Sequence, residues 1–99
     1  MSQGATLTRA EQIKTWLITA LEPQTIEVRD DSHLHAGHEG AKSGGGHFSV
    51  MVVTPRFLGK NHVQRHQMVY QALGDMMKKE IHALSIRALT PDEFLNQKT

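Results

Sequence analysis

Apolar and polar residues alternate along this chain with two different periods, which predict helices and strands in turn. From residue 8 to residue 21 the apolar side chains recur at three- and four-residue intervals, as on one face of a helix. Thr8 and Glu11 can form a capping box at the start of this helix. Residues 25–29 and 47–53 alternate apolar and polar positions instead, which predicts two half-buried strands.

The second half of the chain predicts a long helix followed by a third strand. Apolar positions over residues 61–78 have the helical period, and residues 81–88 alternate as a strand does. Strict alternation in that strand puts His82 on the same face as Leu84 and Ile86. The stripe that we expect to be buried on the long helix consists of Val63, His66, Tyr70, Leu73 and Met77, widened by Val69, Ala72 and Met76.

These elements, with a short last helix capped by Thr90 and Glu93, follow the order α-β-β-α-β-α. The first two strands should pair antiparallel, and the second and third should pair parallel through a right-handed crossover. The expected fold class is therefore α+β, with a three-stranded mixed sheet and helices on one face. Residues 8–96 should form a single domain, with flexible tails at 1–7 and 97–99.

A connection of about 16 residues, Asp31 to Gly46, separates the first two strands. Ordinary hairpin loops have two to five residues, and long loops are usually functional or disordered. This one holds five glycines and the pattern His33-x-His35-x-x-His38. Imidazole is a common metal ligand, so these histidines are candidate ligands, although a solvated polar loop explains the same residues.

The amino-acid composition limits the kinds of reactive and metal-binding site that the chain can form. The chain has 99 residues, a net charge of +1, no cysteine and seven histidines. The absence of cysteine excludes disulfides, a cysteine nucleophile and thiolate metal sites. The sequence shows neither the Ser-His-Asp order of a hydrolase triad nor a phosphate-binding glycine loop before a helix. Five basic residues could form an edge that binds nucleic acid, or could simply be a solvated face. They are Arg56, Lys60, Arg65, Lys78 and Lys79.

The four histidines outside the loop have simpler expected roles. His66 is on the expected core stripe and should be structural, and His47 should be a strand-edge residue. His62 lies near a helix start and should be solvated. His82 has two open interpretations, a satisfied core residue or a ligand.

Several motifs, taken together and in order, resemble the BolA family over residues 8–96. They are His47-Phe48-Ser49-Val50, Val52-Val53-Thr54, Arg56-Phe57-Leu58-Gly59, Gln64-Arg65-His66-Gln67-Met68-Val69-Tyr70, Ile81-His82-Ala83-Leu84-Ser85 and Thr90-Pro91-Asp92-Glu93-Phe94. The resemblance implies a fold like the class II KH domain and a non-enzymatic role.

The resemblance also implies a partner and a cofactor. BolA-like proteins pair with monothiol glutaredoxins and share a [2Fe–2S] cluster, with the glutaredoxin cysteine and glutathione on the other side. The BolA-like side supplies the histidine of the Ile-His-Ala-Leu motif, here His82, and a loop residue. The family pattern places His35 first for that second ligand, His38 next and His33 third. The implied role is iron–sulfur trafficking or iron and redox regulation.

Two alternatives stay open at this point. One is a DNA-binding transcriptional regulator, although the turn at residues 57–62 has one glycine where the KH loop has two. The other is a lone metal module made of His33, His35 and His38. We further expect a monomer with no cofactor in isolation, no membrane partner and a cytoplasmic location, with a mature organellar form left open.

Overall fold

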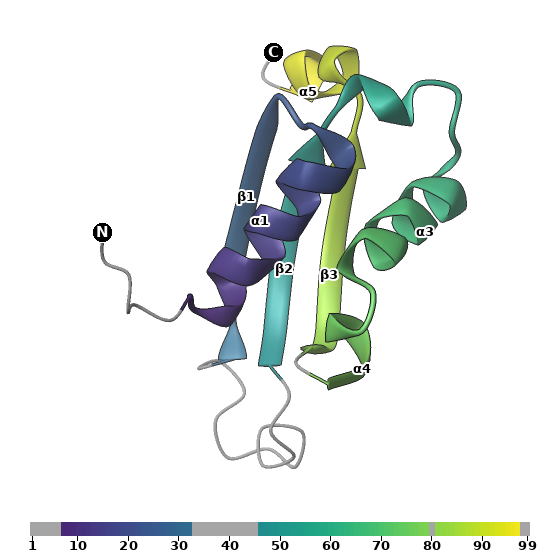
Figure 1. The fold of residues 1–99 in the computed structure, drawn as a ribbon. Coiled ribbons are helices and arrows are strands. Elements are labelled where there is room, and N and C mark those ends of the chain that lie inside the picture. Colours follow the sequence, from purple (N-terminus) through teal and green to yellow (C-terminus); the bar gives the residue numbers. More distant parts are fainter. Residues whose placement is uncertain (1–6, 33–45, 80, 98–99) are drawn as a thin grey trace.

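The computed structural model describes residues 7–32, 46–79 and 81–97, and it has the predicted α+β architecture (Figure 1). The central sheet has the strand order β1-β2-β3. In chain order the elements are α1 (Arg9–Leu21), β1 (Thr25–Asp30), β2 (Gly46–Val53), the 3₁₀ turn η2 (Pro55–Phe57), α3 (His62–Leu73), α4 (Met76–Lys79), β3 (Ile81–Leu89) and α5 (Pro91–Gln97).

Both predicted strand pairings are confirmed. β1 runs antiparallel to β2, from Thr25 opposite Val53 to Asp30 opposite Phe48. β2 runs parallel to β3, because α3 and α4 carry the chain back between them. Figure 1 shows α1 and α3 over one face of the sheet. The end of β1 and the starts of β2 and β3 therefore share one end of the sheet, which we call the α4 end.

The helix starts follow from local side-chain chemistry. Reciprocal side-chain to backbone bonds open α1, α3 and α5, so that otherwise unsatisfied N–H groups find acceptors. The pairs are Thr8 with Glu11, Asn61 with Gln64, and Thr90 with Glu93. The first and third confirm the sequence prediction, and the second had not been predicted.

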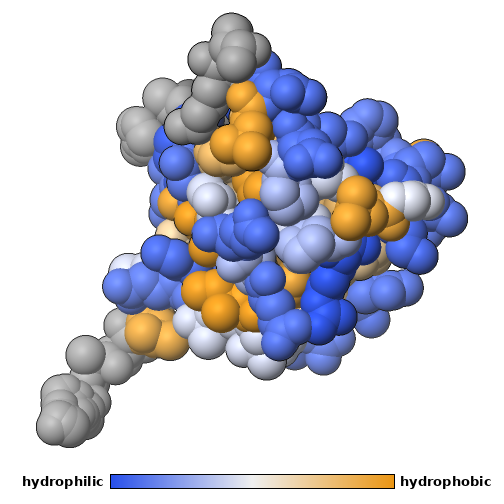
Figure 2. All heavy atoms as spheres, turned by 90° about the horizontal axis from the view of Figure 1, so that it is seen from above, coloured by the Kyte–Doolittle hydropathy of each residue, from blue (hydrophilic) through white to orange (hydrophobic). Residues whose placement is uncertain are grey.

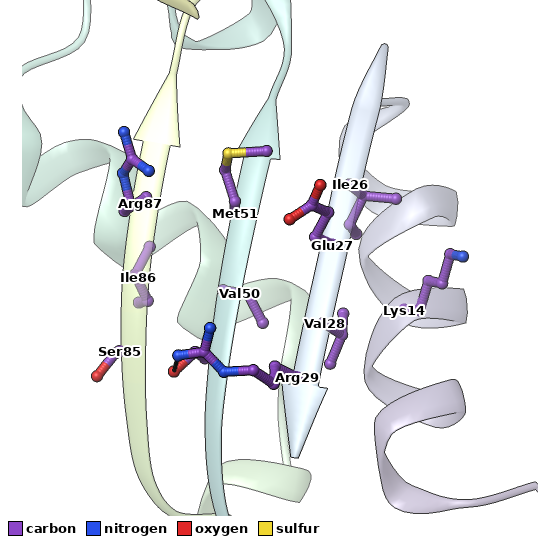
Figure 3. A pocket seen from close by; sticks show the side chains of 11 residues that line it. Lys14, Ile26, Glu27, Val28, Arg29, Val50, Met51, Ser85, Ile86 and Arg87 are labelled. Carbon is purple, nitrogen blue, oxygen red and sulfur yellow. Dashed lines mark hydrogen bonds between the residues drawn. The ribbon is translucent and has the colours of Figure 1, made fainter. Parts of the chain in front are cut away.

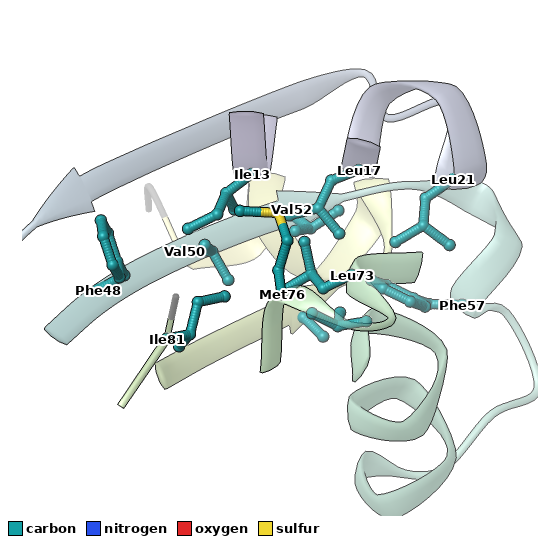
Figure 4. Close-up of a cluster of buried hydrophobic side chains, with 12 residues drawn as sticks. Ile13, Leu17, Leu21, Phe48, Val50, Val52, Phe57, Leu73, Met76 and Ile81 are labelled. Carbon is teal, nitrogen blue, oxygen red and sulfur yellow. The ribbon is translucent and has the colours of Figure 1, made fainter. Parts of the chain in front are cut away.

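The core lies between the helices and the covered face of the sheet (Figure 4). Alternate residues of β2 point into it, and the 3.6-residue period of α1 brings three side chains to meet them. Phe57 of η2 closes one end of the cluster and is fully buried. The contributors labelled from α1 and β2 are Ile13, Leu17, Leu21, Phe48, Val50 and Val52.

The long second helix differs from its prediction in two ways. It ends at Leu73, and Gly74 takes the left-handed φ of +52° before the short α4 begins. Its buried face is also rotated by one position, since Arg65, Val69 and Leu73 are buried. Val63 is 66% exposed and Tyr70 is 42% exposed, so these two members of the predicted stripe were wrong. Val69, Leu73 and Met76 are buried as predicted. His66 is half-buried at the margin of the true face.

The rotation of α3 has a physical cause in Arg65, which is only 6% exposed. Its guanidinium donates to the carbonyl oxygens of Lys60 (2.9 Å) and Ala88 (3.0 Å), and to Glu93 Oε1 (2.7 Å). It also lies 5.8 Å from the ring centre of Phe57. A buried arginine is tolerated when its donors are paired in this way. The contact ties α3 to the end of β3 and to α5.

The surface at the α5 end carries apolar side chains only in separated groups (Figure 2). Hydrophilic side chains lie between these groups in that view. Among the residues that the structure describes, no helix is long and apolar enough to cross a bilayer.

Candidate functional site

A β-bulge at the start of β3 determines where His82 lies. Gly46 pairs with Ile81, but the next residue of β2, His47, pairs with Ala83. His82 is therefore the extra residue of a bulge, and such a residue leaves the regular alternation. Ile81 is buried in the core and His82 is exposed. The prediction that His82 shares a face with Leu84 and Ile86 was wrong for this reason.

The bulge brings His82 against a second histidine. The ring centres of His47 and His82 are 5.1 Å apart, and the rings are inclined at 45°. His47 alternates with the buried Phe48, so it faces away from the helices. It is half-buried, and its Nε2 is shielded from solvent. The sequence had suggested only a strand-edge role for His47, because a bulge leaves no sign in the alternation.

The segment 33–45 leaves and re-enters the described fold beside this pair. His33, His35 and His38 belong to it and lie outside the described residues. Its two flanking residues are Ser32 and Gly46, at the α4 end of the sheet. The Ser32 hydroxyl oxygen accepts from the backbone N–H of His47 (3.1 Å), and the His47 carbonyl accepts from the N–H of Asp31 (2.7 Å).

Asp31 holds the end of β1 in place. Its side chain is only 12% exposed and accepts from Arg29 Nε (2.6 Å) and from the Ser49 hydroxyl (2.5 Å). The hydrogen bond and charge of Asp31 raise the pKa of Arg29 above its usual value. The side chain of Asp30 instead accepts from the N–H of Ser32 (2.9 Å). The two adjacent aspartates therefore accept from different donors.

The imidazole side chains at this end of the sheet can coordinate a metal ion through nitrogen. Neutral imidazole binds zinc, copper, iron and nickel. Within residues 7–32, 46–79 and 81–97, no three histidine or acidic side chains lie close enough to hold a metal ion. The chain has no cysteine, so it cannot supply sulfur. His82 can therefore contribute one imidazole to a site that other groups complete.

The five predicted basic residues do not share one edge. Arg65 is buried and donates to backbone carbonyls, and Arg56 forms an ion pair with Glu22. Lys60 lies between η2 and α3, whereas Lys78 and Lys79 are exposed on α4 at the other end of the molecule (Figure 1). Of these five residues, Lys78 and Lys79 are the two that lie on α4, shortly before His82 in the chain.

A hollow of about 690 Å³ crosses the three strands further along the sheet (Figure 3). Figure 3 shows Arg29 reaching from β1 across β2, where it donates to Ser49 (3.4 Å). Arg87 on β3 is hydrogen-bonded to Gln97 of α5. The residues lining the hollow do not include His47 or His82, so the hollow and the histidine pair are separate features.

Comparisons with solved structures give the same fold. The BolA domain of SufE1 from Arabidopsis thaliana superposes with a TM-score of 0.77 at 42% identity, covering 90% of this chain and 99% of that one. The solution structure of BolA1 from Mus musculus gives a TM-score of 0.76 at 34% identity, covering 100% and 82%.

Comparisons of sequence identify relatives with BolA names as well. Protein BOLA1, chloroplastic, from Arabidopsis thaliana is 40% identical over 93 residues, which are 91% of this chain and 58% of that protein. The DNA-binding transcriptional regulator BolA of Escherichia coli is 34% identical over 84 residues, 85% of this chain and 77% of that one. The chain spans only 24% of SufE-like protein 1 of Arabidopsis thaliana. The family model for BolA-like protein matches residues 17–93, and the chain belongs to this family.

Proposed function

We propose that this chain is a non-enzymatic partner of a monothiol glutaredoxin, with which it co-ligates a [2Fe–2S] cluster. Its own ligands would be His82 and one histidine of the segment 33–45, with His35 first and His38 second. The partner cysteine and glutathione would supply the two sulfur ligands. The role served would be cluster trafficking or iron and redox regulation.

The observation that carries the proposal is the exposed imidazole of His82 beside the ends of the histidine-bearing segment. His82 is placed outside the core by the bulge, so its ring can face a partner. Gly46, where that segment ends, pairs directly with Ile81, the residue before His82. A ligand on the segment therefore starts from a point close to His82.

The donor set fits such a cluster. Iron–sulfur clusters with two histidines in place of two cysteines have higher reduction potentials than all-cysteine clusters. This cysteine-free chain can supply the nitrogen side of such a ligand set and requires a thiolate partner for the rest. One ligand on a strand and one on a glycine-rich segment would allow capture and release.

The test is reconstitution with a monothiol glutaredoxin, iron, sulfide and glutathione, followed by visible absorption and circular dichroism. The wild-type chain should form a one-to-one heterodimer whose spectrum differs from that of the glutaredoxin homodimer. His82→Ala should abolish this difference. His62→Ala is the matched control, because His62 is also an exposed histidine but lies at the start of α3. An unchanged spectrum with His82→Ala would refute the assignment.

The second ligand can be identified in the same assay. His35→Ala should change the spectrum of the heterocomplex, and His38→Ala should leave it unaltered. If only His38→Ala changes the spectrum, then the order of the two residues is reversed. If neither single variant nor the double variant has an effect, the second ligand does not come from this pair.

A second candidate function, DNA binding, is supported by the name of the Escherichia coli relative. The net charge of +1 gives little general attraction to phosphates. Two of the five predicted basic residues, Arg56 and Arg65, already form ion pairs with carboxylates of the same chain. DNA binding at about 150 mM salt that depends on Lys78 and Lys79 would support this candidate. Binding that disappears as salt rises to that level would count against it.

A further inference from the structure

We propose that His47 and His82 together form a binding site for one divalent transition-metal ion, independent of any glutaredoxin. The two rings come from neighbouring strands, and their centres lie 5.1 Å apart with the rings tilted by 45°. His82 is shared with the cluster site proposed above, but His47 has no part in that site. The inference therefore adds both a ligand residue and a ligand class.

The spacing of the rings matches that of two imidazoles on one metal ion. Zinc–nitrogen bonds are about 2.0–2.1 Å long, and each ring centre lies about 1.1 Å behind its nitrogen. Two such ligands on a tetrahedral ion then have ring centres about 5 Å apart. The observed separation of 5.1 Å and the inclination of 45° between the rings are compatible with this arrangement.

The backbone holds this pair before any ion arrives. His47 is fixed on both sides, because its N–H donates to Ser32 and its carbonyl accepts from Asp31. His82 is the unpaired residue of the bulge, but both of its neighbours are paired, Ile81 with Gly46 and Ala83 with His47. Ligands held in this way lose little conformational freedom on binding, which strengthens a site of few ligands.

The coordination sphere is open on the partner side. His82 is exposed, so water or an added ligand can fill the remaining positions. Among divalent ions, zinc, copper and nickel suit imidazole best. An ion held here occupies the imidazole of His82 and so competes with the cluster for the same residue.

The experiment titrates zinc chloride into the full chain carrying His33→Ala, His35→Ala and His38→Ala. This background removes the loop histidines, which offer zinc an alternative site. Isothermal titration calorimetry should give one zinc ion per chain. Adding His47→Ala or His82→Ala should each weaken zinc binding by about tenfold or more. His62→Ala, an exposed histidine elsewhere, is the matched control and should change nothing.

Three results would overturn the proposal. They are loss of zinc binding in the triple background itself, unaltered affinity in the His82→Ala variant, and a fall in affinity with His62→Ala as large as that with His82→Ala. His82 is exposed, so its variant should fold even if the His47 variant does not, and far-ultraviolet circular dichroism checks this.

A separate measurement distinguishes this proposal from the glutaredoxin proposal. In the reconstituted heterocomplex, His47→Ala should retain the altered cluster spectrum, while His82→Ala loses it. If no heterocomplex forms, zinc binding by the isolated chain still supports the metal site. If zinc does not bind, a heterocomplex still supports the glutaredoxin proposal.

Discussion

At the scale of single residues, Gly46 is the position where the candidate site and the core meet. A Cβ atom at Gly46 would lie 2.5 Å from Cε2 and 2.8 Å from Cζ of Phe48. The Phe48 ring is 2% exposed and packed in the core, so it has little room to retreat. Gly46→Ala should therefore lower the free energy of unfolding by about 1–3 kcal/mol, measured by urea denaturation.

A double-mutant cycle tests the cause of this loss. Phe48→Leu removes the ring atoms that a new methyl group would meet, so the alanine should cost less in the Phe48→Leu background. Gly59→Ala is the contrasting control. Gly59 has φ of +76° and open space around it, so alanine there should cost about 1 kcal/mol through the backbone alone. Equal costs of Gly46→Ala in both Phe48 backgrounds would disprove the steric explanation.

At the scale of elements, periodicity predicted all three strands, their pairing and the first and last helices with their caps. It failed at three places: the helix predicted over residues 61–78 breaks at Gly74, the buried face of α3 is rotated, and His82 lies in a bulge. The buried guanidinium of Arg65 turned α3, because the carbonyl of Ala88 and the carboxylate of Glu93, both distant in sequence, satisfy its donors. The bulge placed His82 beside His47, because strand register depends on the partner strand and not on local alternation. Burial of a polar group and register are tertiary properties.

The contact between α3 and α5 gives a prediction about acid. The hydrogen bond from Arg65, with that from the N–H of Thr90, lowers the pKa of Glu93 to about 2. An unfolded glutamate has a pKa of about 4.3. Because the folded pKa is lower, Glu93 stabilises the fold above about pH 4.3, and this contribution disappears as the pH falls towards 2.

Glu93→Gln isolates this contribution, because glutamine can still serve in a capping box. At pH 7 the variant should be less stable by about 1 kcal/mol, since the Glu93 side chain is 46% exposed and solvent screens the pair. The difference from wild type should shrink between about pH 4.5 and pH 2 in denaturant titrations. Glu11→Gln alters the same capping position in the exposed box of α1 and should have little effect. A Glu93→Gln deficit that stays constant with pH would contradict the ion-pair explanation.

At the scale of the whole molecule, the positions of the exposed apolar side chains bear on how a partner could dock over His82. Within the described part of the chain, the large exposed hydrophobic residues lie before or on α1, around the start of α3, on α3 and on α5. None of those residues lies on α4 or β3. Apolar anchors normally dominate stable protein interfaces. A partner that contacts only α4 and β3 around His82 would therefore depend on coordination and on the charges of Lys78 and Lys79.

The proposed heterodimer should accordingly depend on its cluster. Ligands from both chains hold the complex together only while the cluster is present. A ligand that binds the assembled state stabilises that state, so its removal favours dissociation. Removal of the cluster with a chelator should weaken the affinity for the glutaredoxin by about tenfold or more. Light scattering with size-exclusion chromatography should then return a chain of 11.1 kDa. His82→Ala should give the same dissociation without a chelator, whereas His62→Ala should not. An apo complex as tight as the holo complex would show that the interface has apolar or electrostatic contacts sufficient to hold it without coordination.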